Sequence, residues 1–214
     1  MIQKKEFIGS LHRAGEIYTQ KPIEVYDHDF PNLAEGVAIP HGIYDINRNI
    51  GYVNIGTSRD TSEFACDSLR HWWYNRGRYD YPEATQILIL ADCGGSNGCR
   101  HYVFKKALQE LANTIGLDIR IAHYPPYTSK WNPIEHRLFS HITRSLSGIL
   151  LSGYELVKEL IRKTVTEPGL KVKANIIDKV YETGKKVTEE FKENMEIVFD
   201  EYLPRWNYTA KCMK

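Results

Sequence analysis

The chain has 214 residues, 42% hydrophobic and 26% charged, which is ordinary globular composition with enough length for one sizeable core. The formal net charge is +1, so global charge argues neither for nor against a nucleic-acid partner. No run approaches the roughly 20 apolar residues of a membrane span, and the start MIQKKEF lacks the apolar core of a signal peptide. The four cysteines have neither disulfide-framework nor zinc-ribbon spacing. We therefore expect a soluble, cytoplasmic protein in a reducing setting, with no membrane partner.

The first half of the chain predicts a β-hairpin followed by a helix. Residues 37–44 and 50–55 are predicted strands joined by a polar turn. Asp60 with Glu63 three residues on is a helix-start pattern, and the helix ends by Gly77. Its apolar face, which we expect to be core rather than a base-stacking platform, carries Phe64, Ala65, Leu69, Trp72 and Trp73.

The next segment contains an unbroken apolar run, QILILAD at residues 86–92. Its lack of alternation predicts a strand buried on both faces. The strand ends at Asp92 and is followed by the glycine-rich CGGSNG, a helix over 100–115 with Gly116 as its C-cap, and a short strand over 119–123. This order predicts an α/β fold with a mixed sheet flanked by helices. In such sheets function gathers at the carboxyl ends of the central strands, where the pattern puts Asp92.

A proline-rich loop and a well-signalled helix start follow in HYPPYTSKWNPIEHRLFSHI. Asn132 suits the N-cap, Pro133 the first helical position, and Glu135 the acid of a capping box. The apolar arc of this helix consists of Ile134, Leu138, Phe139, Ile142 and Leu146. On a helical wheel Glu135 falls inside that arc. A carboxylate is costly there unless it is paired, hydrogen-bonded or bound to a metal.

Beyond residue 147 the sequence becomes more helical and polar. Amphipathic or charged helices are predicted over 153–165 and 187–203, and a short strand in GLKVKA. We therefore divide the chain into a core over 1–150 and a mostly helical extension over 151–214 that packs on the core.

Asp92 and Glu135 each have an ordinary structural explanation. An acid after a buried strand is often a turn residue or helix cap, and Glu135 could simply reach back to the Asn132 amide. Two carboxylates that converge at a strand end, however, suit a hard cation such as Mg²⁺ or Mn²⁺. Such an ion can activate a water and stabilise a phosphoryl-transfer transition state. We therefore take Asp92 and Glu135 as candidate catalytic residues and metal ligands.

Other metal and phosphate sites are not favoured by the sequence. The glycines after Asp92 are not followed by the Gly-Lys-Ser/Thr of a P-loop. His136 and His141 are five apart, which is off the spacing that shares a helix face, so zinc is disfavoured. Cys93 and Cys99 flank the glycine-rich turn and are expected to be unpaired thiols because the compartment is reducing.

Three basic residues lie near the candidate acids in sequence: Arg100, Lys130 and Arg137. Their charges could contact DNA phosphates. The alternative for each is an ordinary solvated helix face or loop.

The segments ILILADCGGSNGCR and HYPPYTSKWNPIEHRLFSHIT together resemble the DDE transposases of insertion sequences, and most closely the Rhodopirellula-type DDE transposase family. The loop PPYTSKWNPIE is also similar to the proline-rich loop of mariner-like elements. The resemblance implies a ribonuclease H-like fold and two Mg²⁺ ions held by two Asp and one Glu. Asp92 matches the second acid and Glu135 the third. It also implies DNA partners, namely transposon ends and a target, and leaves a homodimer open.

The first acid of this family lies on the opening strand, immediately before a lysine-rich stretch that QKKEFIG matches here. We therefore expect it at or just before Met1, so that the chain is N-terminally truncated. Asp45, Asp29 and Asp27 are candidates for a stand-in, but none fills the motif and none is carried over as catalytic.

The resemblance predicts a transposase catalytic domain for metal-dependent DNA strand cleavage and transfer, inactive alone because one acid of the triad is absent. The alternative is a degenerate ribonuclease H-like module that binds DNA or a protein partner without catalysis. A third hypothesis is a metal-dependent nuclease that recruits another acid.

Overall fold

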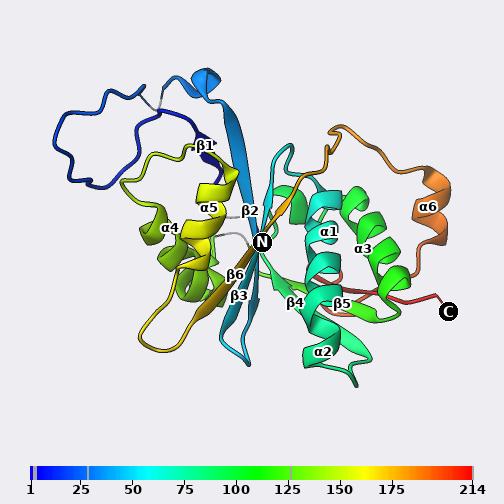
Figure 1. Cartoon of the computed structure of the whole chain (residues 1–214). Coiled ribbons are helices and arrows are strands. Elements are labelled where there is room, and N and C mark those ends of the chain that lie inside the picture. Colours follow the sequence, from blue (N-terminus) through cyan, green and yellow to red (C-terminus); the bar gives the residue numbers. More distant parts are fainter. Residues whose placement is uncertain (2–3, 28, 126, 214) are drawn as a thin grey trace. The chain divides into compact units, whose positions relative to one another are not determined.

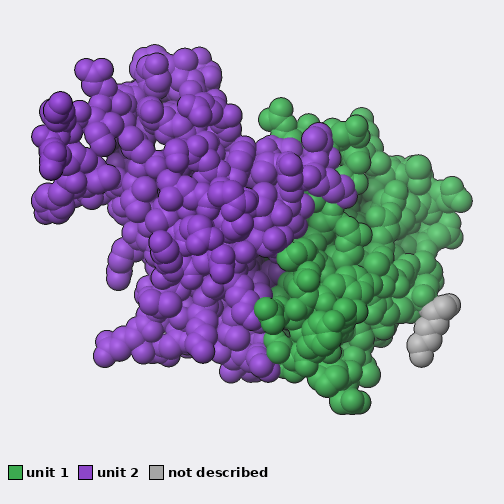
Figure 2. All heavy atoms as spheres, in the orientation of Figure 1, with its two compact units in different colours: residues 1, 59–132, 181–214 green, residues 2–58, 133–180 purple. Residues whose placement is uncertain are grey.

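The chain folds into two compact units, each with its own sheet and helices (Figures 1 and 2). The computed structural model describes residues 1, 4–27, 29–125 and 127–213. Unit 1 consists of residues 1, 59–132 and 181–214. Unit 2 consists of residues 2–58 and 133–180. The fold is therefore mixed α/β, as predicted, and its two mixed sheets are compatible with a ribonuclease H-like transposase domain.

Unit 2 is built on a sheet with the strand order β1-β2-β3-β6. Its strands are β1 Glu6–Ile8, β2 Gly36–Asp45, β3 Ile50–Gly56 and β6 Lys171–Ile177. Strands β2 and β3 form the predicted antiparallel hairpin, in which Gly42 pairs with Val53. Strand β6 begins at Lys171, the third residue of the predicted GLKVKA strand, and extends beyond that segment to Ile177. It runs parallel to β3, with Lys171 paired to Ile50. Both strand predictions are confirmed.

Unit 2 contains the two predicted helical segments and a 3-10 turn that the sequence does not predict. They are a 3-10 turn Pro31–Leu33, a π-helical segment Glu135–Phe139, α4 Ser140–Leu146 and α5 Tyr154–Arg162. The helical run that includes the π segment and α4 begins at Pro133. Its predicted apolar arc is buried throughout, at Ile134, Leu138, Phe139, Ile142 and Leu146.

Two glycines of the hairpin let this helical run approach the sheet closely. A Cβ atom on Gly51 would stand 2.3 Å from Cδ1 of Leu138, and one on Gly42 would stand 2.4 Å from Cε1 of Phe139. Both side chains are buried and cannot move aside freely. The close packing against the hairpin therefore fixes the position of the helical segment that carries Glu135.

Unit 1 is built on a second sheet with the strand order β4-β5-β8-β7. Its strands are β4 Gln86–Ala91, β5 Asp118–His123, β7 Ile197–Phe199 and β8 Asn207–Ala210. Strands β4 and β5 are parallel, and Ala91 pairs with His123 at their carboxyl ends. Strand β8 runs antiparallel to both β5 and β7. The predicted strands over 86–92 and 119–123 are confirmed.

The helices of unit 1 are α1 Ser62–Trp72, a π-helical segment Trp73–Gly77, α2 Arg78–Asp80, α3 Tyr102–Ile115 and α6 Glu189–Asn194. Helix α3 ends at Gly116, whose φ of 74° is the left-handed conformation expected of a C-cap glycine. The apolar face of α3 packs against strands β5 and β8. This core consists of Cys66, Phe104, Ala107, Leu108, Leu111, Ala112, Ile119, Ile121, Ile197, Tyr208 and Ala210.

The prediction that the 86–92 strand is buried on both faces is wrong. Leu88 is 61% exposed and Leu90 is 39% exposed, while Ile89 packs on the unit 1 core. The strand lies at the edge of its sheet, and the core covers one of its faces. A continuous apolar run does not distinguish these two situations, because both are compatible with an apolar strand.

The second half of the chain contributes to both sheets. The helix predicted over 187–203 is correct for α6, but residues 197–199 form strand β7 instead. Residues 151–214 thus supply β6 to unit 2 and β7 and β8 to unit 1, rather than a mostly helical extension. The division of the chain at residue 150 stays a prediction. Within the described parts of the chain, no helix combines the length and apolar character needed to cross a bilayer.

We predict that Gly51→Ala lowers the stability of unit 2 by about 1–3 kcal/mol, because the added methyl group overlaps the buried Leu138 side chain. Thermal unfolding followed by circular dichroism measures this change. Gly153→Ala is the matched control, since no atom lies within 4 Å of the position of its Cβ. Equal melting temperatures for the two variants would contradict the close packing of helix and hairpin.

Candidate catalytic site

Asp92 follows β4 directly and opens a short loop that ends at Cys99, ahead of helix α3. The loop contains a 3-10 turn over Gly95–Asn97, and Gly95 has a positive φ of 57°. A residue with a Cβ atom is strained in that conformation, so the glycine permits the tight turn. The middle of the loop is held to helix α1, because the Ser62 hydroxyl donates to the Ser96 carbonyl oxygen at 2.9 Å.

Two buried side chains hold the ends of this loop. At one end, Nδ1 of His123 lies 2.8 Å from the carbonyl oxygen of Asp92. At the other, Nζ of Lys105 donates to the carbonyl oxygen of Cys99 at 2.6 Å. Lys105 is 4% exposed, and its ammonium group lies 4.8 Å from the centroid of the Tyr208 ring. Burial lowers the pKa of Lys105 to about 8.

The hydrogen bonds of His123 determine its tautomer. Since a carbonyl oxygen can only accept, Nδ1 must carry the proton toward Asp92. In the neutral ring Nε2 then accepts from the Tyr208 hydroxyl, 3.0 Å away. Burial lowers the pKa of His123, despite the opposing effect of its bond to Asp92, and burial also raises the pKa of Tyr208. Both shifts favour a neutral His123 that orients the Asp92 backbone.

The cysteines that flank the loop form a disulfide, so the prediction of unpaired thiols at these positions is wrong. The Cα atoms of Cys93 and Cys99 lie 5.0 Å apart, within the range that a disulfide spans. The glycine-rich turn between them folds the chain back far enough for the two to meet. The disulfide and the hydrogen bonds to both ends of the loop restrain the backbone after Asp92.

The side chain of Asp92 is half-buried, and its environment disfavours the charged form. Burial raises the pKa of Asp92, a hydrogen bond from Asn97 works in the opposite direction, and the charge of Asp60 adds to the increase. One carboxylate oxygen of Asp92, Oδ1, is shielded from solvent and has no hydrogen-bond partner among the described residues. Such an oxygen fits a cation ligand, because a buried acceptor without a partner is otherwise costly.

Asp60 was predicted only as part of a helix start. The structure instead gives the cap of α1 to Thr61, whose side-chain oxygen accepts from the Phe64 amide at 3.2 Å. The Oδ1 atom of Asp60 is buried without a hydrogen-bond partner in the described part of the chain. A Cβ atom on Gly95 would lie 3.6 Å from Oδ2 of Asp60. Asp60 is therefore an acid beside the Asp92 loop that sequence reasoning missed.

Glu135 belongs to unit 2, where it opens the π-helical segment Glu135–Phe139. It is half-buried, whereas its neighbours on the other side of the helix are exposed: His136, Arg137, Ser140 and Thr143. The wheel argument is thus confirmed for the local environment of Glu135. π-helical turns are rare and occur often at functional sites.

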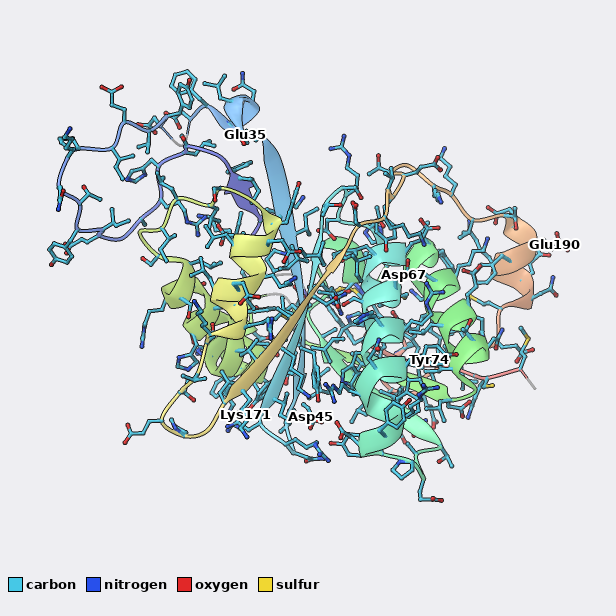
Figure 3. The ribbon with its side chains drawn as sticks, in the orientation of Figure 1. Glu35, Asp45, Asp67, Tyr74, Lys171 and Glu190 are labelled. Carbon is cyan, nitrogen blue, oxygen red and sulfur yellow. A yellow bond between two sulfur atoms is a disulfide. The ribbon has the colours of Figure 1, made fainter. Side chains whose placement is uncertain are left out.

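Two of the three candidates for a stand-in acid, Asp45 and Asp27, accept local hydrogen bonds from backbone amides. Oδ1 of Asp45 accepts from the amides of Asn47 and Arg48, both at 3.1 Å, and so caps the hairpin turn next to Lys171 (Figure 3). Oδ1 of Asp27 accepts from the amide of Asp29 at 3.4 Å. These bonds give the acids ordinary structural roles.

The predicted DNA-contacting residues are distributed over both units. Arg100 and Lys130 belong to unit 1, Arg137 belongs to unit 2, and all three are exposed. Nζ of Lys130 lies 5.0 Å from the ring centroid of Trp131, which is 67% exposed. An exposed lysine beside an exposed aromatic ring can contact both a phosphate and a base.

The described residues contain no group of three or more His, Cys, Asp and Glu side chains that could hold a metal ion. A Mg²⁺ ion does not require such a group, because it is often held by one or two carboxylates together with waters and substrate phosphates. The unpartnered, buried Oδ1 of Asp92 therefore fits the metal that the resemblance implies.

Comparison with known proteins identifies a family. The family model described as Rhodopirellula transposase DDE domain matches residues 2–212 of this chain. The match spans both units and includes Asp92 and Glu135, and it confirms the resemblance found in the sequence. No curated protein and no solved structure matches the chain.

We predict that Asp92→Asn stabilises the protein at pH 7 by on the order of 1 kcal/mol, as is common when a strained functional group is removed. The raised pKa means that the ionised carboxylate is less favourable in the folded than in the unfolded chain. The extra stability of the variant over the wild-type chain should appear as the pH rises through the pKa of Asp92 in the unfolded chain, and it should be small at pH 4. Melting temperatures at pH 4 and pH 7 measure it.

Asp118→Asn is the control of opposite sign. In the wild-type chain, the hydrogen bond from Lys211 lowers the pKa of Asp118. The charged form of Asp118 therefore contributes to stability above its pKa in the unfolded chain, and this contribution is lost as the pH falls. We expect this variant to be less stable at pH 7. Destabilisation by Asp92→Asn at pH 7 would contradict the electrostatic environment described for Asp92.

Proposed function

The chain belongs to the Rhodopirellula transposase DDE domain family, and on this premise we propose that it is a transposase catalytic domain for metal-dependent cleavage and transfer of DNA strands, which supplies two of the three family acids and has at most residual activity alone. In this reaction a water molecule hydrolyses a phosphodiester bond at a transposon end, and the 3′-hydroxyl group that is released attacks a phosphodiester bond of the target DNA. Asp92 and Glu135 serve as two of the acids that hold Mg²⁺ or Mn²⁺. The family also implies a ribonuclease H-like fold, with which the two mixed sheets are compatible.

The observation that carries the proposal is the environment of Asp92. Its carboxylate keeps a buried oxygen without a partner, although the backbone around it is fixed by His123, by Lys105 and by the disulfide. A structural acid in such a fixed loop would be expected to use its oxygens in hydrogen bonds. A prepositioned but unsatisfied carboxylate is what a metal-binding site requires before the ion arrives.

The residues of the chain then have separate roles. Asp92 and Glu135 bind the cation, which when bound activates the attacking oxygen and neutralises charge on the phosphate. His123 keeps the Asp92 backbone in one orientation through the Nδ1 bond. The helical segment that carries Glu135 is positioned by its packing against the hairpin at Gly42 and Gly51. Support for Glu135 as a ligand comes from its motif and its place on the apolar side of the helix.

DNA is the partner that the family implies, and the exposed Lys130 with Trp131 is a part of unit 1 that suits it. We predict that Lys130→Gln weakens binding to duplex DNA about equally for all sequences and lowers the slope of log affinity against log salt by about 1. Fluorescence anisotropy at several salt concentrations measures both. Lys185→Gln is the control, because Lys185 is ion-paired with Glu63. An equal loss in both variants would argue against a specific contact at Lys130.

Nicking of supercoiled plasmid in Mn²⁺ tests the catalytic proposal. The sequence matches two of the three family acids, so we expect weak nicking by the wild-type chain. Asp92→Asn and Glu135→Gln should each reduce it roughly 100-fold or more, the scale on which a transition-state stabiliser is lost. Asp45→Asn, which alters a turn acid, should leave the rate unchanged.

The controls separate the catalytic proposal from its alternative. Nicking that survives both Asp92→Asn and Glu135→Gln would come from another site or a contaminant and would overturn the proposal. Absence of nicking together with salt-sensitive DNA binding would instead support a module that binds DNA without catalysis.

A further inference from the structure

We propose that Asp60 is a ligand of the divalent cation, acting together with Asp92 within unit 1. This inference rests on the proposed function and adds to its metal site a residue that the motifs do not include. The ion is a hard, oxygen-preferring cation such as Mg²⁺ or Mn²⁺.

The two acids lie against neighbouring residues of one turn. A Cβ atom on Gly94 would lie 3.5 Å from Oδ2 of Asp92, and one on Gly95 would lie 3.6 Å from Oδ2 of Asp60. Consecutive Cα atoms are about 3.8 Å apart, so both carboxylates reach the same short stretch of backbone. Neither glycine places a side chain against the carboxylate that it faces.

Both acids also keep an oxygen that is shielded from solvent and has no hydrogen-bond partner in the described part of the chain, Oδ1 of Asp60 and Oδ1 of Asp92. The turn between them adds a third such atom, the hydroxyl oxygen of Ser96, a residue that is only 7% exposed. Unpartnered buried oxygens are uncommon in native proteins and each one destabilises the fold. A hard cation takes oxygen ligands, so these three atoms on one loop and its neighbouring acid are candidate donors.

The ordinary roles for Asp60 are filled by other residues or do not use its orphaned oxygen. Thr61, and not Asp60, caps helix α1. The buried ammonium group of the loop network, that of Lys105, donates its hydrogen bond to the Cys99 carbonyl oxygen.

A Mn²⁺ titration of the full chain by isothermal calorimetry tests the inference without relying on activity. The variants are Asp60→Asn and Asp92→Asn, and Glu63→Gln is the matched control. Glu63 is an acid of the same helix start that is already paired with Lys185 at 3.0 Å. We expect each Asp variant to raise the Kd for Mn²⁺ at least 10-fold, since each removes a direct ligand, and Glu63→Gln to change it less than twofold.

A second measurement locates the ion independently of the variants. Bound Mn²⁺ should broaden the amide NMR signals of Gly94 and Gly95 in the wild-type chain, and Asp60→Asn should reduce this broadening at the same Mn²⁺ concentration. If Asp60→Asn does not fold by circular dichroism, Asp60→Ser takes its place, because it keeps a small polar side chain.

The outcomes separate the two levels of the argument. A Kd for Asp60→Asn that matches Glu63→Gln, beside a weakened Asp92→Asn, overturns the role of Asp60 and leaves Asp92 as a ligand. An unchanged Kd in Asp92→Asn overturns the proposed function together with this inference. Weakening in both Asp variants, with broadening at the two glycines, supports the paired site.

Discussion

The hydrogen bond between His123 and the carbonyl oxygen of Asp92 is the contact on which the unit 1 site depends. It joins the carboxyl end of β5 to the residue that follows β4, and through Tyr208 it extends to β8. A protonated His123 could no longer accept from Tyr208, so the low pKa produced by burial preserves the whole chain of contacts. The backbone at Asp92 is therefore tied to the sheet by hydrogen bonds, although the residue itself lies in a loop.

The two family acids are positioned by different kinds of interaction. Asp92 depends on buried polar contacts and a disulfide, whereas the helical segment of Glu135 depends on apolar packing against a hairpin that has glycine at Gly42 and Gly51. Polar networks fix direction, because hydrogen bonds have narrow geometry. Apolar packing fixes distance, because close-packed side chains leave no room for shifts. Each acid thus has a well-defined place within its own unit.

Features with a local cause were predictable from the sequence. The buried arc and half-buried Glu135 follow from helical periodicity, and the placement of Asp92 after β4 follows from the apolar run. Features set by tertiary structure were not. The exposed face of β4 depends on which side the core covers, and strand β7 lies in a charged stretch where helix propensity pointed the other way. The Cys93–Cys99 disulfide does not follow from the sequence, because a reducing compartment disfavours disulfides and only the folded glycine-rich turn brings the two residues together.

Asp60 is the clearest case of information that only the fold supplies. In sequence it stands 32 positions from Asp92 (92 minus 60) and beside a good helix cap, so local reasoning assigns it to the helix start. The turn after β4 brings Gly95 against it and leaves both carboxylates with an unsatisfied oxygen. Such local conflicts persist in native proteins mainly where function requires them. The energetic cost of the unsatisfied oxygens is therefore evidence for a ligand, because a protein selected for stability alone would have replaced either acid by an amide or a hydroxyl residue.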